Sequence, residues 1–297
     1  MIIIDESYII RSDKLRGRNQ KYALQKDGKK YIYKFQSVNN EIWSELIAEQ
    51  LGKQVGIEMA HYQLATRNGT IGLLTDHFIS PQEYIISSDK LRENAQSIFD
   101  ENNIPLVLSD NTVYNIVDAA AIYDDRVDVN QLKNELLMRW CFYGLIMEGD
   151  KNETNIAFIK GPSALRLSPD FDNASMAGLN KNIQNMIDGI RRGQSIYKYT
   201  DNFKSCLKIS SEDTGYFLTD FTNFVKLFPD EARTCIEHLK MINLEDAFDI
   251  VETANGVQIP WEVKFWLSNT ITARLKDMIN IYESSKQKTY KKEKNEN

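Results

Sequence analysis

The sequence has little cysteine, no long apolar run and no excess of positive charge. Its three cysteines, Cys141, Cys206 and Cys235, are far apart and odd in number, so we expect a reduced chain without structural zinc. No apolar run approaches the roughly 18 residues that a membrane helix needs. The run from Met1 to Ile4 precedes Asp5, and we interpret it as a strand rather than a signal peptide. These absences favour a cytoplasmic protein.

The charge balance excludes further classes. The formal net charge is -6 over 297 residues, which argues against a surface that binds nucleic acids or membranes in general. Hydrophobic residues make up 42% and charged residues 26%, an ordinary composition for a globular protein with a substantial core. We therefore expect a folded protein with no membrane partner and no direct nucleic acid partner.

The first 80 residues carry most of the strand signals. Tyr22 to Gln25 and Lys30 to Gln36 read as a hairpin across the turn Lys26-Asp27-Gly28. Apolar residues at helical spacing predict an amphipathic helix over Asn40 to Gly56. Further strands follow, with Ile71 to Phe78 leading out of this region. The order strand, strand, helix, strand, strand is typical of the small lobe of a kinase-like fold.

From Ser87 onward the pattern is mainly helical. Asn130 to Met147 predicts a largely buried helix, and Ile156 to Ile159 with Ala164 to Leu167 predicts a short hairpin after it. We therefore predict an α+β protein with a bilobal, protein-kinase-like fold. Its β-rich N-lobe covers residues 1–80, its larger helical C-lobe covers residues 81–285, and a disordered tail covers residues 286–297.

Polar residues that suit phosphoryl transfer gather around that hairpin. Asp150 and Asn155 lie in the loop GDKNETN before it, and Asp170-Phe171-Asp172 follows it. Phosphoryl transfer needs a carboxylate beside the attacking hydroxyl and oxygen ligands that hold magnesium against the phosphates. Because a hairpin returns the chain to its starting point, we expect Asp172 to lie near Asn155. Isolated matches to such a spacing are often solvated turns, so other features must support this prediction.

A lysine in the N-terminal region supplies such support. Lys34 lies in the centre of the strand YIYKFQ, where a lysine can contact the α- and β-phosphates of ATP or simply point to solvent. The helix that follows offers Glu41 and Glu45, either of which could pair with Lys34.

In the order and spacing of these residues, the chain resembles the HipA-like serine/threonine kinases in their short stand-alone form. The resemblance covers about Gly17 to Ser175 and, more loosely, the helical remainder. The matching blocks occur in order: RGRNQKYAL resembles the phosphate loop, YIYKFQ the lysine strand, NEIWSELIAEQLG the Asn-Glu helix, TDHFIS the hinge, GDKNETN the catalytic loop and LSPDFDNAS the metal segment.

The resemblance implies a role for each matched residue. Asp150 would be the catalytic base, Asn155 and Asp172 would hold magnesium, and Lys34 would bind ATP phosphates. The family pattern selects Asp172, with Asp170 as runner-up.

The same resemblance implies contacts to the nucleotide. Glu41 is selected over Glu45 as the partner of the strand lysine. Asp76 and Phe78 would frame the adenine, and Gly17 and Lys21 would belong to the phosphate loop. The resemblance also implies regulation by autophosphorylation of a serine in that loop, but here Arg16 and Arg18 flank Gly17 and the nearest serine is Ser12.

The expected activity is the ATP- and Mg²⁺-dependent transfer of a phosphoryl group to a protein serine or threonine. The expected partners are ATP and an unidentified protein substrate. Family toxins also pair with a DNA-binding antitoxin, so an antitoxin-like partner is a further candidate. Two alternatives stay open: a small-molecule kinase resembling aminoglycoside and choline kinases, and a pseudokinase that binds without transferring.

Overall fold

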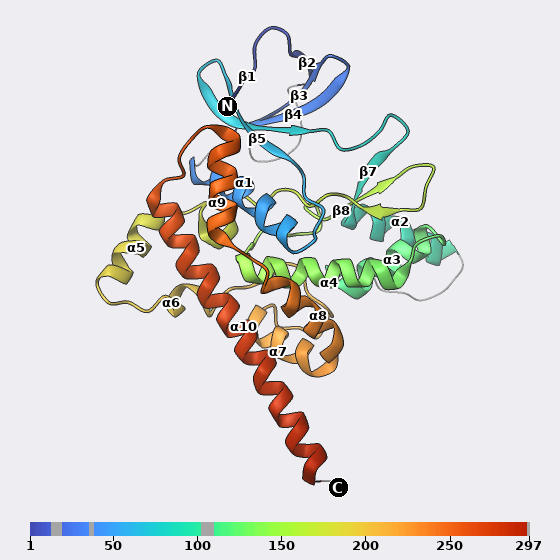
Figure 1. Cartoon of the computed structure of the whole chain (residues 1–297). Coiled ribbons are helices and arrows are strands. Elements are labelled where there is room, and N and C mark those ends of the chain that lie inside the picture. The colour runs from blue at the N-terminus through green and yellow to red at the C-terminus, as the bar shows by residue number, and fades with distance from the viewer. Residues whose placement is uncertain (13–19, 36–38, 102–109, 296–297) are drawn as a thin grey trace.

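The computed structural model describes residues 1–12, 20–35, 39–101 and 110–295 (Figure 1). An N-terminal half built mainly on a β-sheet lies against a larger, mostly helical C-terminal half. This arrangement confirms the predicted α+β fold class. No helix in the described ranges is both long enough and apolar enough to cross a membrane.

The N-terminal sheet has six strands in the order β1-β5-β6-β4-β3-β2. All neighbours pair antiparallel except β1 and β5, which are parallel. The strands are β1 (Ile2–Ile3), β2 (Ile9–Ser12), β3 (Lys21–Lys26), β4 (Lys29–Phe35), β5 (Tyr62–Arg67) and β6 (Thr70–Asp76).

Two tight turns set the register of this sheet. Asp27-Gly28 joins β3 to β4 and Asn68-Gly69 joins β5 to β6, and all four residues have positive φ angles, between 49° and 78°. Two successive positive φ angles match the twist of a two-residue hairpin, and Asp, Asn and Gly adopt them most readily. The predicted hairpin around Asp27 is thereby confirmed.

Helix α1 (Asn39–Gln54) covers one face of the sheet. Its apolar side chains, among them Leu46 and Leu51, join the main core with Leu64 and Leu73 of the sheet. A smaller core that includes Tyr33 lies apart from it. The helix predicted over Asn40 to Gly56 is confirmed.

The C-terminal half is organised around α4, whose side chains are mostly buried and whose N-cap is Asp128. Trp140 of α4 packs against three phenylalanines of α7. The helices of this half are α2 (Ser88–Glu101), α3 (Val113–Tyr123), α4 (Val129–Ile146), the 3-10 helix η1 (Met176–Gly178), α5 (Ile183–Arg191), α6 (Tyr197–Thr200), α7 (Phe217–Leu227), α8 (Pro229–Leu239), α9 (Leu244–Asn255) and α10 (Trp261–Asn295).

A second, three-stranded sheet follows the first in the chain. It consists of β7 (Tyr84–Ser87), β8 (Ala157–Lys160) and β9 (Arg166–Leu167), all paired antiparallel. The pairing of β8 with β9 confirms the predicted hairpin. Since β7 precedes α2, this sheet ties the start of the helical half to the hairpin that follows the loop at residues 149–155.

The C-terminal helices differ from the expected layout in two respects. Helix α9 lies beside α1 of the N-terminal half, so the helical region is not confined to the C-lobe (Figure 1). Helix α10 continues through Asn295, across most of the tail predicted at residues 286–297. That stretch is rich in Lys and contains neither Gly nor Pro, so its sequence does not end the helix.

Candidate active site

Lys34 lies in β4, the central strand opposite Lys21 of β3, and its side chain is almost fully buried. Its ammonium group contacts two carboxylates, Glu45 Oε1 at 2.9 Å and Asp172 Oδ1. Asp172 is 138 residues away in sequence and belongs to the segment 167–175, which starts at the last residue of β9. A buried lysine is therefore held between α1 and this segment, where the two halves of the molecule meet.

The partner of Lys34 on α1 corrects one prediction. The resemblance selected Glu41, but the ion pair is made by Glu45, one turn further along the helix. Glu45 is fully buried, and its second oxygen accepts a hydrogen bond from the backbone N–H of Asn173 at 2.8 Å. The Glu45 carboxylate thus joins Lys34 to segment 167–175. These two contacts explain why Glu45, and not the residue one turn earlier, forms the ion pair with Lys34.

Lys34 and Asp172 each stabilise the charged form of the other. Burial disfavours the charged form of Lys34, but Glu45 and Asp172 outweigh it and raise the pKa of Lys34. Burial likewise opposes ionisation of Asp172, yet Lys34, with weaker contributions from Lys21 and Lys151, lowers the pKa of Asp172 to about 2. Asp172 is therefore an anion at neutral pH. Lys21, which the resemblance assigned to the phosphate loop, is the first residue of β3 and contributes to this field.

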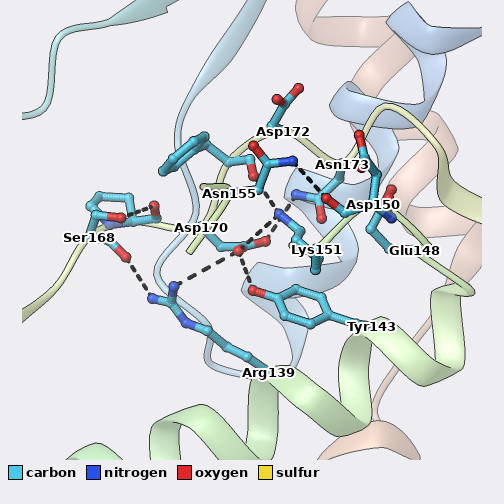
Figure 2. A network of polar contacts seen from close by, with 12 residues as sticks. Arg139, Tyr143, Glu148, Asp150, Lys151, Asn155, Ser168, Asp170, Asp172 and Asn173 are labelled. Carbon is cyan, nitrogen blue, oxygen red and sulfur yellow. Dashed lines mark hydrogen bonds and ion pairs between the residues drawn. The ribbon is translucent and has the colours of Figure 1, made fainter. Parts of the chain in front are cut away.

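Asp150 and Asn155 lie in one loop immediately after α4, as predicted (Figure 2). The Asp150 side chain is exposed, and Asn152 Nδ2 donates to its Oδ1 at 3.0 Å. Asn155 Nδ2 donates to the backbone oxygen of Asp150 at 2.6 Å, which fixes the amide orientation and turns Asn155 Oδ1 the other way. The loop therefore presents an accessible carboxylate and an amide oxygen together.

Asp170 and Lys151 form a buried polar network that the sequence did not reveal (Figure 2). Lys151 Nζ lies 3.2 Å from Asp170 Oδ1 and donates to the backbone oxygen of Phe171, and both charged side chains are buried. Asp170 also accepts hydrogen bonds from Tyr143 and from Asn173 Nδ2. The network fastens loop 149–155 to segment 167–175. In the sequence, the one feature that could have indicated this network is the lysine directly after Asp150.

Asp170 and Asp172 consequently face different surroundings. Asp170 is buried within the network, and its backbone bonds to Glu58 and Ala60 in the connection between α1 and β5. Asp172 has a positive φ of 63°, uncommon for a residue other than Gly, and its side chain is 25% exposed. The turned backbone at Asp172 directs this side chain away from Asp170 (Figure 2), and its Oδ1 contacts Lys34 Nζ. Asp172 is accessible where Asp170 is not.

The remaining predicted residues are placed as follows. Asp76 is exposed at the end of β6, opposite Tyr31 of β4. Phe78 packs against Phe171, with ring centroids 6.1 Å apart, so the predicted hinge contacts segment 167–175. Gly17 lies outside the described residues.

The donor set fits magnesium. Magnesium prefers oxygen ligands and is usually held by one or two carboxylates together with substrate phosphates and water, rather than by a cage of protein ligands. Asp172 offers a carboxylate and Asn155 an amide oxygen from facing segments. The described part of the chain contains no group of three or more His, Cys, Asp or Glu residues arranged for a metal.

Comparisons with known proteins show the family and the fold of the chain. The HipA-like C-terminal domain family matches residues 14–243. The proinflammatory kinase CtkA of Helicobacter pylori superposes with a TM-score of 0.74 and 16% identity, covering 97% of this chain and 99% of that chain. HipA of Shewanella oneidensis MR-1, solved with HipB and operator DNA, superposes with a TM-score of 0.59 and 14% identity, covering 94% of this chain and 68% of that chain.

A choline kinase, LicA of Streptococcus pneumoniae, aligns with a TM-score of 0.26 and 11% identity, over 95% of this chain and 93% of that chain. No curated protein matches the sequence. The likeness to CtkA and HipA confirms the predicted bilobal, kinase-like fold. The family match extends over most of the chain and supports a kinase-type phosphotransferase, so the protein belongs to the HipA-like C-terminal domain family.

Proposed function

We propose that this protein is an ATP- and Mg²⁺-dependent kinase that transfers the γ-phosphate to a serine or threonine hydroxyl of another protein. One observation carries the proposal: Lys34 and Asp172, from opposite halves of the chain, meet beside the loop that presents Asp150 and Asn155. A buried cation, an accessible carboxylate pair and an amide oxygen are the groups that phosphoryl transfer requires.

Each residue then has a distinct task. Asp150, exposed at the loop surface, accepts the proton of the incoming hydroxyl, and Asn155 holds the loop in shape through the backbone oxygen of Asp150. Lys34 contacts the α- and β-phosphates of ATP. Asp172 and Asn155 Oδ1 would hold Mg²⁺, which neutralises charge on the β- and γ-phosphates.

The surroundings of the site support contacts to the rest of the nucleotide. We assign Phe78 and Asp76 to the adenine side, because they follow β6 and Phe78 packs on Phe171, next to Asp172. Lys21 faces the phosphate side beside Lys34. Gly17 is assigned to the phosphate loop by the resemblance alone.

The cellular setting is also a proposal. Helicobacter CtkA is described as a proinflammatory kinase, and Shewanella HipA as part of a toxin–antitoxin system with HipB and DNA. By this likeness we propose a cytoplasmic kinase of toxin type, with an antitoxin-like protein as a candidate partner. The acidic net charge makes direct DNA binding by this chain an unfavourable alternative.

The test is transfer of labelled γ-phosphate from ATP to a cell lysate and to the protein itself, with and without Mg²⁺. Asp150→Asn should lower transfer at least about 100-fold, because it removes the general base while keeping the size of the side chain. The matched control is Asp249→Asn, an exposed aspartate of α9 distant in sequence from the loop, which should transfer as the wild type does.

The outcomes separate the alternatives. Label on a lysate protein that disappears with Asp150→Asn supports a protein kinase. Turnover of ATP with small hydroxyl compounds and no labelled protein would identify a small-molecule kinase. Mg²⁺-dependent ATP binding with no transfer to any acceptor would identify a pseudokinase.

A further inference from the structure

Glu148 is a buried carboxyl group that has no direct part in the proposed phosphoryl transfer. It follows Met147, which ends α4 in a left-handed conformation with φ of 52°, and it comes two residues before Asp150. The Glu148 side chain is completely shielded from solvent. Burial of a carboxylate is costly unless its oxygens receive hydrogen bonds or a countercharge. The partners of Glu148 therefore indicate what it does.

Those partners lie on two different segments. Glu148 Oε1 accepts a hydrogen bond from the backbone N–H of Asp150 at 2.9 Å and another from the hydroxyl of Ser175. Glu148 Oε2 accepts from the backbone N–H of Ser175 at 3.0 Å. Ser175 comes three residues after Asp172, so a single carboxylate joins the residue that carries the proposed base to the segment that carries the proposed metal ligand.

Glu45 forms the complementary link from the other side. It joins Lys34 to the backbone N–H of Asn173, the residue directly after Asp172. Two buried glutamates thus hold the four residues that begin with Asp172, Glu45 from the sheet side and Glu148 from the loop side (Figure 2 shows Glu148 beside Asp150). Of these two glutamates, only Glu148 also contacts the backbone of Asp150.

We propose that Glu148 is a positioning residue for phosphoryl transfer, whose three hydrogen bonds fix Asp150 relative to Asp172. The proposal rests on the kinase function proposed above. Displacement of a reacting group by about 1 Å lowers rates by about 100-fold, so a link of this kind acts on kcat rather than on nucleotide binding.

The charge state of Glu148 makes this role testable. Burial raises the pKa of Glu148 to about 7, against the opposing effect of Lys151. The charged and titratable groups around it are Lys151 and Asp150 of the loop, Glu45 of α1 and Cys206 from the segment before α7. Above pH 7 the ionised carboxylate accepts all three hydrogen bonds. Below pH 7 it carries a proton, and one oxygen no longer accepts freely.

Glu148→Gln reproduces the protonated state at every pH. A glutamine has one acceptor oxygen and an NH₂ group, but both positions occupied by the Glu148 oxygens face N–H donors, on Asp150 and on Ser175. One donor therefore always faces the NH₂ group, and one link is lost. Ser175→Ala is a milder second variant, because it removes the hydroxyl donor and keeps both backbone hydrogen bonds.

The experiment measures kcat and KM for ATP from pH 6 to pH 8.5 for the wild type, Glu148→Gln, Ser175→Ala and the control Glu93→Gln. Glu93 is an exposed glutamate of α2 that pairs with Lys90. Hydrogen exchange of the peptides that contain residues 147–155 and 173–178 is measured in parallel, with no substrate present.

We expect kcat of Glu148→Gln to be about tenfold lower than that of the wild type at pH 8 and about equal to it at pH 6, with KM for ATP changed less than about threefold. At pH 8 the kcat of Ser175→Ala should lie between those of the wild type and Glu148→Gln. The kcat of Glu93→Gln should match that of the wild type. Both peptides should exchange faster in Glu148→Gln. Parallel pH profiles in the wild type and Glu148→Gln, with unchanged exchange, overturn the proposal.

Failure of the kinase function is distinguishable from failure of this inference. If the wild type transfers no phosphate at any pH, the proposed function is wrong, and the exchange measurement alone decides whether Glu148 links the two segments. Faster exchange in both peptides then supports the link, and unchanged exchange refutes it. If Glu148→Gln does not fold, Ser175→Ala tests the link through its lower kcat at pH 8 and its faster exchange in both peptides, and values equal to those of the wild type and Glu93→Gln refute the proposal.

Discussion

Asp170 and Asp172 lie two residues apart, yet removing their charges should have opposite consequences. Asp170 is buried with Lys151, whose side chain is also fully buried, and it accepts hydrogen bonds from Tyr143 and Asn173. Asp170→Asn leaves the ammonium of Lys151 buried without its direct carboxylate partner. Breaking a buried ion pair in this way costs about 3–5 kcal/mol.

The same change at Asp172 is much milder for stability. Asp172 is partly exposed, and Lys34 keeps its contact with Glu45 at 2.9 Å when the Asp172 charge is removed. We expect a cost of about 1 kcal/mol, as for partly solvated pairs. An unfolding entropy of about 2 cal/mol/K per residue converts these energies into a loss in Tm of about 5–8 °C for Asp170→Asn and about 2 °C for Asp172→Asn.

Thermal unfolding followed by circular dichroism gives the stability, and calorimetric titration with ATP in the presence and in the absence of Mg²⁺ gives the binding. Asp172→Asn should lose the Mg²⁺-dependent part of ATP binding while staying folded, whereas Asp170→Asn should melt early and, below its melting temperature, still respond to Mg²⁺. A Tm for Asp170→Asn within about 2 °C of the wild type, or retained Mg²⁺ dependence in Asp172→Asn, would refute the division of roles between these two residues.

Two further predictions concern the N-terminal half. Glu45→Gln removes the charge that holds Lys34, so phosphoryl transfer should fall at least about tenfold, whereas Glu41→Gln should change it less than about threefold in the same assay; equal losses would restore Glu41 as the partner. Asn255→Ala removes the side-chain oxygen that accepts from the Leu64 N–H at 2.8 Å and leaves that buried donor unsatisfied, so urea unfolding should show a loss of about 1–3 kcal/mol.

Features encoded by neighbouring residues could be predicted from the sequence. The turn at Asp27-Gly28 needs two residues that tolerate positive φ, and the chain supplies them between two β-rich runs. Helix α4 has an aspartate at its N-cap and apolar residues on a broad face, so its position followed from local patterns. The hairpin of β8 and β9 was likewise visible, and with it the return of the chain from Asn155 to Asp172.

Features that depend on distant residues could not be predicted in this way. Glu41 and Glu45 are one helical turn apart and chemically identical, so the choice between them depends on how α1 is seated against segment 167–175. The pair of Lys151 and Asp170 was hidden for a related reason: a charged residue is normally assigned to the surface, and only the folded chain shows that these two bury each other. The roles of Asp150, Asn155 and Asp172 remain predictions, although their placement suits them.

The seating of α1 depends on a part of the chain that the family match does not cover. The match ends at residue 243, and α9 begins at Leu244. Helix α9 packs along α1, and at the junction Gln54 and Asn243 exchange hydrogen bonds, at 3.0 Å from Gln54 Nε2 and 2.8 Å from the Asn243 N–H. Because Glu45 of α1 holds both Lys34 and the segment that contains Asp172, a shift of α1 would move both at once. The geometry of the site therefore depends on α9 as well as on the motifs that identify the family.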